Sequence, residues 1–173
     1  LFMRGDVKTM GTEIERKYLI KEKPANLGQY TSHLIEQGYM NVNPVVRIRR
    51  QDNEYYMTYK GSGMIARTEY NLPLTEEAYH HLLPKCDGNI ITKRRYLIPL
   101  ENPLFANGFI PSTDLKLTIE LDVFEGVFDS LIIAEIEFPD IETANALIKP
   151  DWFLEDVSEK REYHNSYLSR MTF

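Results

Sequence analysis

The sequence predicts a mainly β protein of the α+β class, folded as an antiparallel barrel or sheet. Three observations support this. Much of the 173-residue chain alternates apolar and polar side chains with the period of two that a half-buried strand requires. Tight-turn signals separate the alternating segments, with "QDNE" at 51–54 and "GSG" at 61–63. Helical patterns are few and short.

The predicted strands follow one another along most of the chain. We expect them at about 12–21, 34–42, 44–51, 53–61, 64–73, 88–100, 114–126 and 131–139. The segment 75–84 predicts a helix, because Thr75 can cap its start and two glutamates occupy its first turn. A second helix is expected at 141–148, before Pro150, and a third at 159–171.

Length and composition limit the class of protein. No repeat or linker divides the chain, so we expect one domain over residues 11–173. We expect it to follow an N-terminal leader at 1–10, part of which is expected not to be native because Leu1 is no initiator and Met3 or Met10 can serve as the start. An apolar content of 43% supports a sizeable core.

Several partners and compartments are disfavoured. No segment approaches the roughly 18 apolar residues that cross a membrane, and the leader lacks the apolar centre of a signal peptide. A single cysteine, Cys86, excludes an internal disulfide and a cysteine metal cluster, which favours the cytoplasm. The net charge of −6 argues against nucleic acid as the main partner. A homodimer is compatible with a barrel of this kind, because barrel edges and covering helices often pair.

Charged residues occur as same-face pairs in nearly every predicted strand. In "GTEIERKYLI", residues 11–20, two glutamates and a lysine share one face. The same i, i+2 spacing recurs in Arg47/Arg49, Arg67/Glu69, Lys93/Arg95, Glu120/Asp122 and Glu135/Glu137, and Tyr56, Thr58 and Lys60 share a face as well. For any one strand, the ordinary interpretation is a wet outer face.

The set of pairs favours a site instead of a wet surface. Most pairs join like charges, which repel unless a counter-ion or ligand compensates them. A closed barrel with its polar face inward would gather these charges into one concave space. Carboxylates there would hold a hard divalent cation, and arginines and lysines would hold phosphate oxygens. Polyphosphates, which bring their own metal, fit such a site.

The motif Glu13-x-Glu15-x-Lys17 resembles the defining motif of the CYTH superfamily, the triphosphate tunnel metalloenzymes. The order of the other elements carries the resemblance further: "RIR", "TYK", "RTEY", "KRRY", "ELDVFEG" and "AEIEF" follow one another from about residue 12 to 165. The chain is most similar to short bacterial single-domain members. The resemblance implies an eight-stranded antiparallel β-barrel that forms a tunnel, with a few short helices packed outside.

The resemblance also implies roles for individual residues. The divalent metal, Mg²⁺ or Mn²⁺, would be held by Glu13, Glu15, Glu135 and Glu137, with Glu120 and Asp122 near metal and water. The phosphates would be clamped by Lys17, Arg47, Arg49, Lys60, Arg67, Lys93 and Arg95, and Glu69 would complete the tunnel wall. The candidate catalytic residues are Lys17, Glu15 and Glu137.

One departure from the family pattern concerns the C-terminal segment. Family members often end with Asp-Lys-Arg-Tyr-x-Asn, and here "EKREYHN" stands at 159–165, so Arg161 takes the place of the lysine. We expect Arg161 to bind substrate there, although a guanidinium differs in shape from an ammonium. His33 and His164 stand apart from any metal-ligand spacing, and we expect no metal role for them.

The leading hypothesis is metal-dependent hydrolysis of inorganic triphosphate to pyrophosphate and phosphate, with in-line attack by water. A nucleotide-using relative is the main alternative: an adenylyl cyclase, a nucleoside triphosphatase or a thiamine triphosphatase. The chain lacks the His-Phe signature of the cyclases, and its only tryptophan, Trp152, lies far along the chain. A non-catalytic polyphosphate-binding module is the third hypothesis; the carboxylates disfavour it because they cost affinity for a polyanion unless metals neutralise them.

Overall fold

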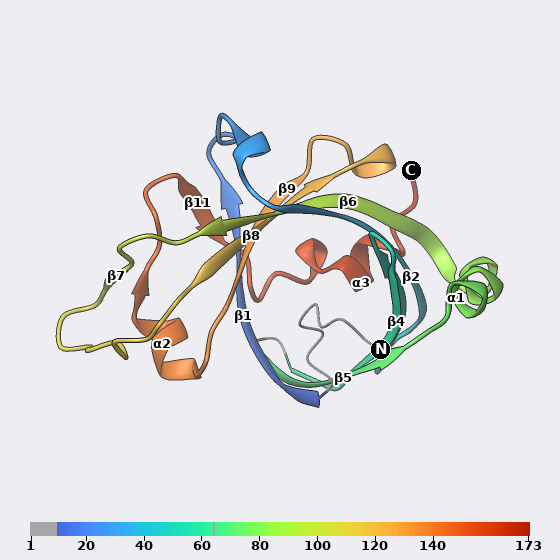
Figure 1. The fold of residues 1–173 in the computed structure, drawn as a ribbon, viewed down its shortest axis with the longest axis horizontal. Coiled ribbons are helices and arrows are strands. Elements are labelled where there is room, and N and C mark those ends of the chain that lie inside the picture. Colours follow the sequence, from blue (N-terminus) through green and yellow to red (C-terminus); the bar gives the residue numbers. More distant parts are fainter. Residues whose placement is uncertain (1–9, 64) are drawn as a thin grey trace.

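The computed structural model describes residues 10–63 and 65–173 (Figure 1). The predicted leader therefore lies outside the described residues, apart from Met10. In the described part of the chain, no helix is long and apolar enough to cross a membrane.

Eight antiparallel strands close into a barrel, as predicted (Figure 1). They are β1 (Met10–Ile20), β2 (Ser32–Val42), β3 (Val45–Gln51), β4 (Glu54–Lys60), β5 (Ala66–Pro73), β6 (Asp87–Pro99), β8 (Thr118–Phe124) and β9 (Ile132–Glu137). Their order around the barrel is β1-β5-β4-β3-β2-β6-β8-β9, and pairing of β1 with β9 closes it. The predicted strand at 114–126 is shorter than expected and begins only at Thr118.

Short helices and strands connect and cover the barrel. The predicted first two helices are present as α1 (Glu76–Leu82) and α2 (Ile141–Ala146), although the second ends at Ala146 and not at Ile148. The Thr75 side chain caps α1 by accepting the Ala78 N–H at 3.1 Å, and the Asp140 side chain caps α2. Further elements that the periodicity did not predict are β7 (Leu104–Phe105), β10 (Leu147–Ile148), β11 (Phe153–Asp156) and 3₁₀ turns at Leu27–Gln29, Leu83–Lys85 and Gly126–Phe128.

The predicted helix at 159–171 is wrong. The segment forms a 3₁₀ turn, Arg161–Tyr163, and the four-residue α3, Asn165–Leu168. His164 separates the two because its backbone is extended, with φ −82° and ψ 136°. Its buried ring interacts through Nε2 with the Ser158 carbonyl oxygen at 2.9 Å, so burial of this ring overrides the helical pattern.

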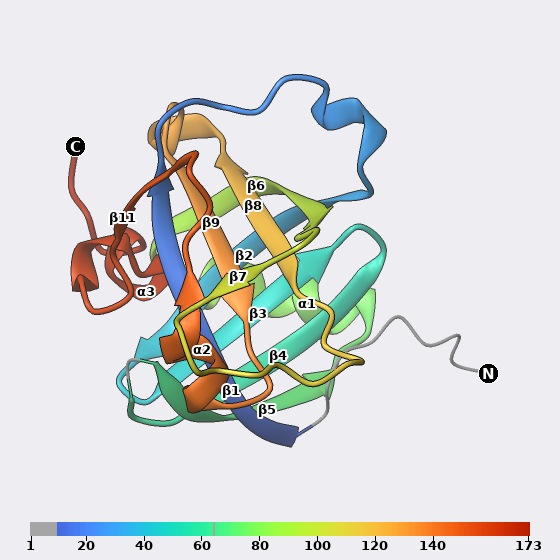
Figure 2. The same ribbon diagram turned by 90° about the vertical axis from the view of Figure 1, so that its left-hand side faces the viewer.

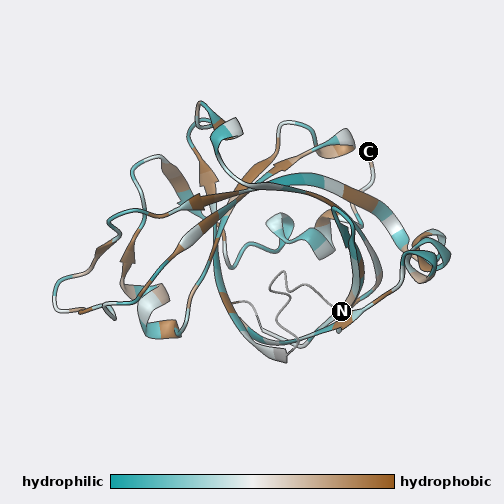
Figure 3. Ribbon diagram, viewed as in Figure 1, coloured by the Kyte–Doolittle hydropathy of each residue, from teal (hydrophilic) through white to brown (hydrophobic). Residues whose placement is uncertain are grey.

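The larger hydrophobic core lies outside the barrel. It joins the outward faces of β1, β8 and β9 to α2 and β11. In Figure 3, hydrophobic and hydrophilic segments alternate along the barrel strands, as this arrangement requires. Leu121, Ala134, Ile136 and Phe153 are completely buried in this core. The polar residues of the same strands consequently face the barrel interior.

A second apolar cluster closes one end of the barrel. Figures 1 and 2 place α3 across that end. Leu168 of α3 packs there with residues of β2, β3, β6, β8 and β9: Tyr39, Val45, Ile91, Phe124 and Ile133. The C-terminal segment thus acts as a plug, and the polar cavity occupies the rest of the interior.

Candidate active site

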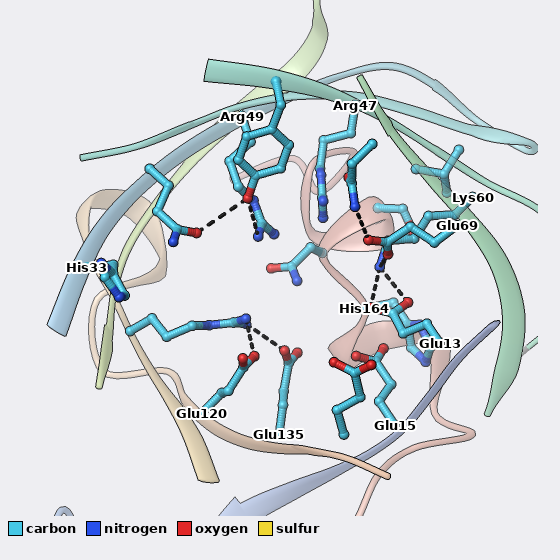
Figure 4. Close-up of a pocket in the computed structure, with 18 of the residues that line it drawn as sticks. Glu13, Glu15, His33, Arg47, Arg49, Lys60, Glu69, Glu120, Glu135 and His164 are labelled. Carbon is cyan, nitrogen blue, oxygen red and sulfur yellow. Dashed lines mark hydrogen bonds and ion pairs between the residues drawn. The ribbon is translucent and has the colours of Figure 1, made fainter. Parts of the chain in front are cut away.

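The barrel encloses a cavity of about 690 Å³ (Figure 4). Most of the residues that the charge pattern singled out line it: Glu13, Glu15, Lys17, Arg47, Arg49, Lys60, Arg67, Glu69, Arg95, Glu120, Glu135 and Glu137. Lys93 and Asp122 lie behind the wall and are completely buried. Arg161 is exposed and is not among the residues that line the cavity.

Several carboxylates line one side of the cavity, opposite two arginines. Figure 4 shows Glu13, Glu15, Glu120 and Glu135 along one side, facing Arg47 and Arg49. We call the carboxylates of β1, β8 and β9 the acidic wall; they are Glu13, Glu15, Glu120, Glu135 and Glu137. The closing of the barrel brings them together, because strand register sets Glu15 opposite Glu137 and Glu120 opposite Glu135.

Lysine 17 neutralises part of the acidic wall. Its ammonium contacts Glu135 directly and lies 3.0 Å from Glu15. Burial alone would lower the pKa of Lys17, but the two carboxylates outweigh it and raise that pKa above its ordinary value. The pKa of Glu135 falls well below its usual range, because Lys17 and Arg95 outweigh the opposing effect of burial. Both groups are therefore charged at neutral pH.

Arg95 is the centre of a second ionic cluster. Its guanidinium donates to Asp122 and Glu135 at 2.6–2.7 Å and also contacts Glu120. Asp122 in turn contacts Lys93. Burial lowers the pKa of Lys93 to about 8, although Asp122 opposes that shift. Asp122 and Lys93 thus support Arg95 from behind the cavity wall.

A third ionic cluster joins β1, β4 and β5. The Lys60 ammonium lies 2.6 Å from Glu13 and 2.7 Å from Glu69, and Arg67 lies 3.1 Å from both Glu13 and Glu15. Burial by itself would raise the pKa of Glu69, but Lys60 and Arg47 outweigh it and lower the pKa to about 2.

This shift predicts how acid affects stability. A depressed carboxylate pKa contributes stability that is complete above the unfolded value, near 4.5, and disappears as pH falls towards 2. We expect Glu69→Gln to make the free energy of unfolding depend less steeply on pH between about 5 and 2. Urea unfolding of wild type and variant across this range measures the slope, with the exposed Glu101→Gln as control. An unchanged slope in Glu69→Gln would contradict the assigned ion pairs.

Arg47 and Arg49 differ from the other cavity cations. Both side chains are more than nine-tenths buried, and neither forms an ion pair with a carboxylate among residues 10–63 and 65–173. Arg47 donates to the Thr58 hydroxyl at 3.0 Å, and its Nε has no partner in the described part of the chain. Arg49 donates to Gln37 and Tyr56, both neutral. No described carboxylate contacts either guanidinium directly, so both keep N–H groups for an anionic ligand, and burial without such a ligand is costly.

Sequence reasoning missed several residues that line the cavity. They are His33, Tyr39, the hairpin residues Gln51–Glu54, Asn71 and the plug residues His164–Ser166. The His33 ring contacts Asp52 through Nδ1 at 2.7 Å. The period of two places residues 33, 35, 37 and 39 on one face of β2, so that signal could have found His33 and Tyr39. Only the tertiary fold brings the plug and the hairpin tip to the cavity.

The donor set suits a hard divalent metal. The acidic wall offers only carboxylate oxygens, which Mg²⁺ and Mn²⁺ prefer. Among the described residues, however, no three His, Cys, Asp or Glu side chains converge as a ready-made ligand cluster. Lys17, Arg67 and Arg95 hold the carboxylates instead. Binding of a metal at this wall would therefore require these ion pairs to loosen.

Known proteins share the fold and much of the sequence. The CYTH domain profile matches residues 11–172. An inorganic triphosphatase of Nitrosomonas europaea is 34% identical over 161 residues, 91% of this chain and 97% of that protein. An inorganic triphosphatase of Acetivibrio thermocellus is 35% identical over 164 residues, 92% of this chain and 94% of that protein.

A solved structure extends the comparison to three dimensions. The crystal structure of the inorganic triphosphatase NE1496 superposes with a TM-score of 0.63 and 31% identity, covering 92% of this chain and 95% of the other. Similarity in sequence and in fold thus extends over nearly the whole described chain. The polar barrel, the ordered motifs and the matched profile together show that this chain belongs to the CYTH domain family.

Proposed function

We propose that the protein hydrolyses inorganic triphosphate to pyrophosphate and phosphate inside its barrel. The observation that carries this proposal is the buried pair Arg47 and Arg49, which no described carboxylate contacts directly and which faces the acidic wall across one cavity. An anion that carries a metal fits both sides at once. The two relatives named inorganic triphosphatase support the choice of substrate.

The family implies a divalent metal cofactor, and we propose Mg²⁺ or Mn²⁺. The residues that would hold it are Glu13, Glu15, Glu135 and Glu137, with Glu120 beside them. When bound, the metal would neutralise phosphate charge and make the phosphorus easier to attack. Because Asp122 lies behind the wall and contacts Lys93 and Arg95, we assign it a supporting role.

The chain's own residues would bind and orient the substrate. Arg47 and Arg49 would bind phosphate oxygens through N–H groups that no carboxylate occupies. Lys17, Lys60, Arg67 and Arg95 would exchange their carboxylate partners for phosphate oxygens as the substrate enters. These cations would then stabilise the charge that develops on the phosphate oxygens in the transition state.

Hydrolysis adds one water molecule across a phosphoanhydride bond. Water forms a bond to a terminal phosphorus, the bridging P–O bond breaks, and the proton leaves on a glutamate of the acidic wall. We propose that Lys17, Glu15 and Glu137 are the catalytic residues, since they lie together where β1 meets β9. Arg161 is left outside this proposal because its side chain is exposed and is not among those that line the cavity.

A substrate panel tests the proposal. With Mg²⁺ or Mn²⁺, purified protein is expected to release phosphate from triphosphate with a kcat/KM at least tenfold above that for ATP or thiamine triphosphate. Phosphate release is measured for each substrate, with and without EDTA. Cyclic AMP as the main product from ATP, or no turnover of triphosphate with either metal, would overturn the proposal. A cytoplasmic location remains a prediction from the single cysteine.

A further inference from the structure

Arg49 is held by neutral hydrogen-bond partners on two neighbouring strands. Its Nε donates to Gln37 Oε1 at 2.9 Å, and one terminal nitrogen donates to the Tyr56 hydroxyl at 3.3 Å. The guanidinium lies 5.9 Å from the centre of the Tyr56 ring. Strand register produces this arrangement, because Gln37 of β2 and Tyr56 of β4 are both directly opposite Arg49 of β3.

Gln37 is itself fixed by burial and by a second hydrogen bond. Its side chain is completely buried, and its Nε2 donates to the Tyr39 hydroxyl at 3.2 Å. The Tyr39 contact directs the amide nitrogen away from Arg49, which leaves the amide oxygen as the acceptor for the guanidinium. Tyr56 is anchored in a similar way, because its hydroxyl donates to Gln51 Oε1 at 3.3 Å.

The neutrality of these partners distinguishes Arg49 from the other arginines that hold carboxylates. Arg67 is paired with Glu13 and Glu15, and Arg95 with Asp122, Glu120 and Glu135. Replacing the Gln37 amide by a carboxylate of the same shape would give Arg49 an ion pair as well. An ion pair at this position would compete with a phosphate for the same guanidinium charge.

We propose that Gln37 is a positioning residue that orients Arg49 and leaves its charge uncompensated for the substrate. The inference rests on the proposed triphosphatase function and extends it to a residue that does not line the cavity. Gln37 accepts only the Nε N–H and Tyr56 accepts from one terminal nitrogen, so the other terminal N–H groups remain available to phosphate oxygens. Tyr56 is the second neutral support of the same guanidinium.

The variant Gln37→Glu tests the inference, because it changes charge and almost nothing else in shape. We expect KM for triphosphate to rise about tenfold while kcat stays within roughly threefold. The reason is that the added charge weakens binding of the substrate and of the transition state by the same factor. Binding of sodium triphosphate in EDTA should weaken by a similar factor, because metal takes no part there. The control is Gln29→Glu, which adds the same charge at an exposed position and should change neither value.

A neutral variant separates charge from packing. Gln37→Met keeps a similar volume but removes the hydrogen-bond acceptor, so KM should rise less than in Gln37→Glu. The variants ranked by KM should not fall in the same order as when they are ranked by melting temperature. If Gln37→Glu does not fold, Tyr56→Phe is measured instead, with binding expected to weaken several-fold. Wild-type KM in Gln37→Glu, or wild-type binding in Tyr56→Phe, would overturn the inference. Wild-type protein that fails to bind or hydrolyse triphosphate would overturn the proposed function as well.

Discussion

Replacing Arg49 with alanine is expected to lower kcat/KM for triphosphate by about 10²–10³-fold, the usual cost of losing a charged donor that stabilises a transition state. The side chain is buried, is held in place by Gln37 and Tyr56, and lacks a carboxylate partner in the described chain. Its removal therefore takes away a positive charge that is not already held by a carboxylate. Initial rates over a range of triphosphate concentrations measure the effect.

The response to metal distinguishes this loss from damage to the acidic wall. Because Arg49 faces that wall from across the cavity (Figure 4), additional Mg²⁺ or Mn²⁺ should not restore the Arg49→Ala rate. The variant should also fold, since it removes a buried charge that nothing neutralises. Arg50→Ala is the matched control: it is the next residue along β3, on the opposite strand face, and donates to the Asp52 carbonyl oxygen. Wild-type turnover in Arg49→Ala would exclude it as a phosphate ligand.

The barrel was predictable because strand periodicity and local turns specify most of it. All eight predicted strands are present, with the main difference at Thr118, where β8 begins. Alternation alone left open which face points inward. The charge pairs resolved that question correctly for most residues, because like charges at i, i+2 are costly on an ordinary exposed face and acceptable around a ligand.

The C-terminal segment was not predictable from local pattern. Residues 159–171 have helical composition, yet the chain breaks at His164, whose ring is buried against Ser158. The strand β11 likewise forms only because β1 offers an edge to it. Leu168 packs inside the end of the barrel, a contact between segments far apart in sequence. Such tertiary contacts override intrinsic propensity, and a single sequence does not encode them as a period.

In the candidate site, too, local pattern predicted which residues face inward, whereas tertiary contacts decide how they are arranged. The alternation correctly grouped Lys93 with Arg95 and Glu120 with Asp122 on inward faces, but it did not show how deep each one lies. Lys93 and Asp122 contact each other and are fully buried, so they form a support beneath Arg95. Gln37 shares the face of β2 that carries His33 and Tyr39, but the charge pairs did not single it out because its side chain is neutral. Its importance emerges only from its distance to Arg49.

Glu15→Gln is expected to lower kcat/KM by about 10²-fold at low metal concentration, and additional metal should partly restore it. The substitution keeps the volume of the side chain and removes its negative charge, so a divalent cation loses an anionic ligand. Glu15 lies opposite Glu137 and accepts from Arg67 at 3.1 Å, where β1 meets both β5 and β9. Lys17 keeps Glu135 as a partner in the variant, so we expect the barrel to remain folded.

Titrating Mg²⁺ or Mn²⁺ against the rate distinguishes a metal ligand from a group that only holds Lys17 and Arg67. A lost ligand raises the metal concentration needed for half-maximal rate, whereas a lost ion-pair partner leaves it unchanged and alters KM for triphosphate. Glu22→Gln, at an exposed position after β1, is the matched control and should leave both values as in wild type. Activity that falls in Glu15→Gln without any shift in the metal titration would remove Glu15 from the metal set. Rescue of Arg49→Ala by metal would in turn show that the cavity does not divide into an acidic side for metal and a basic side for phosphate.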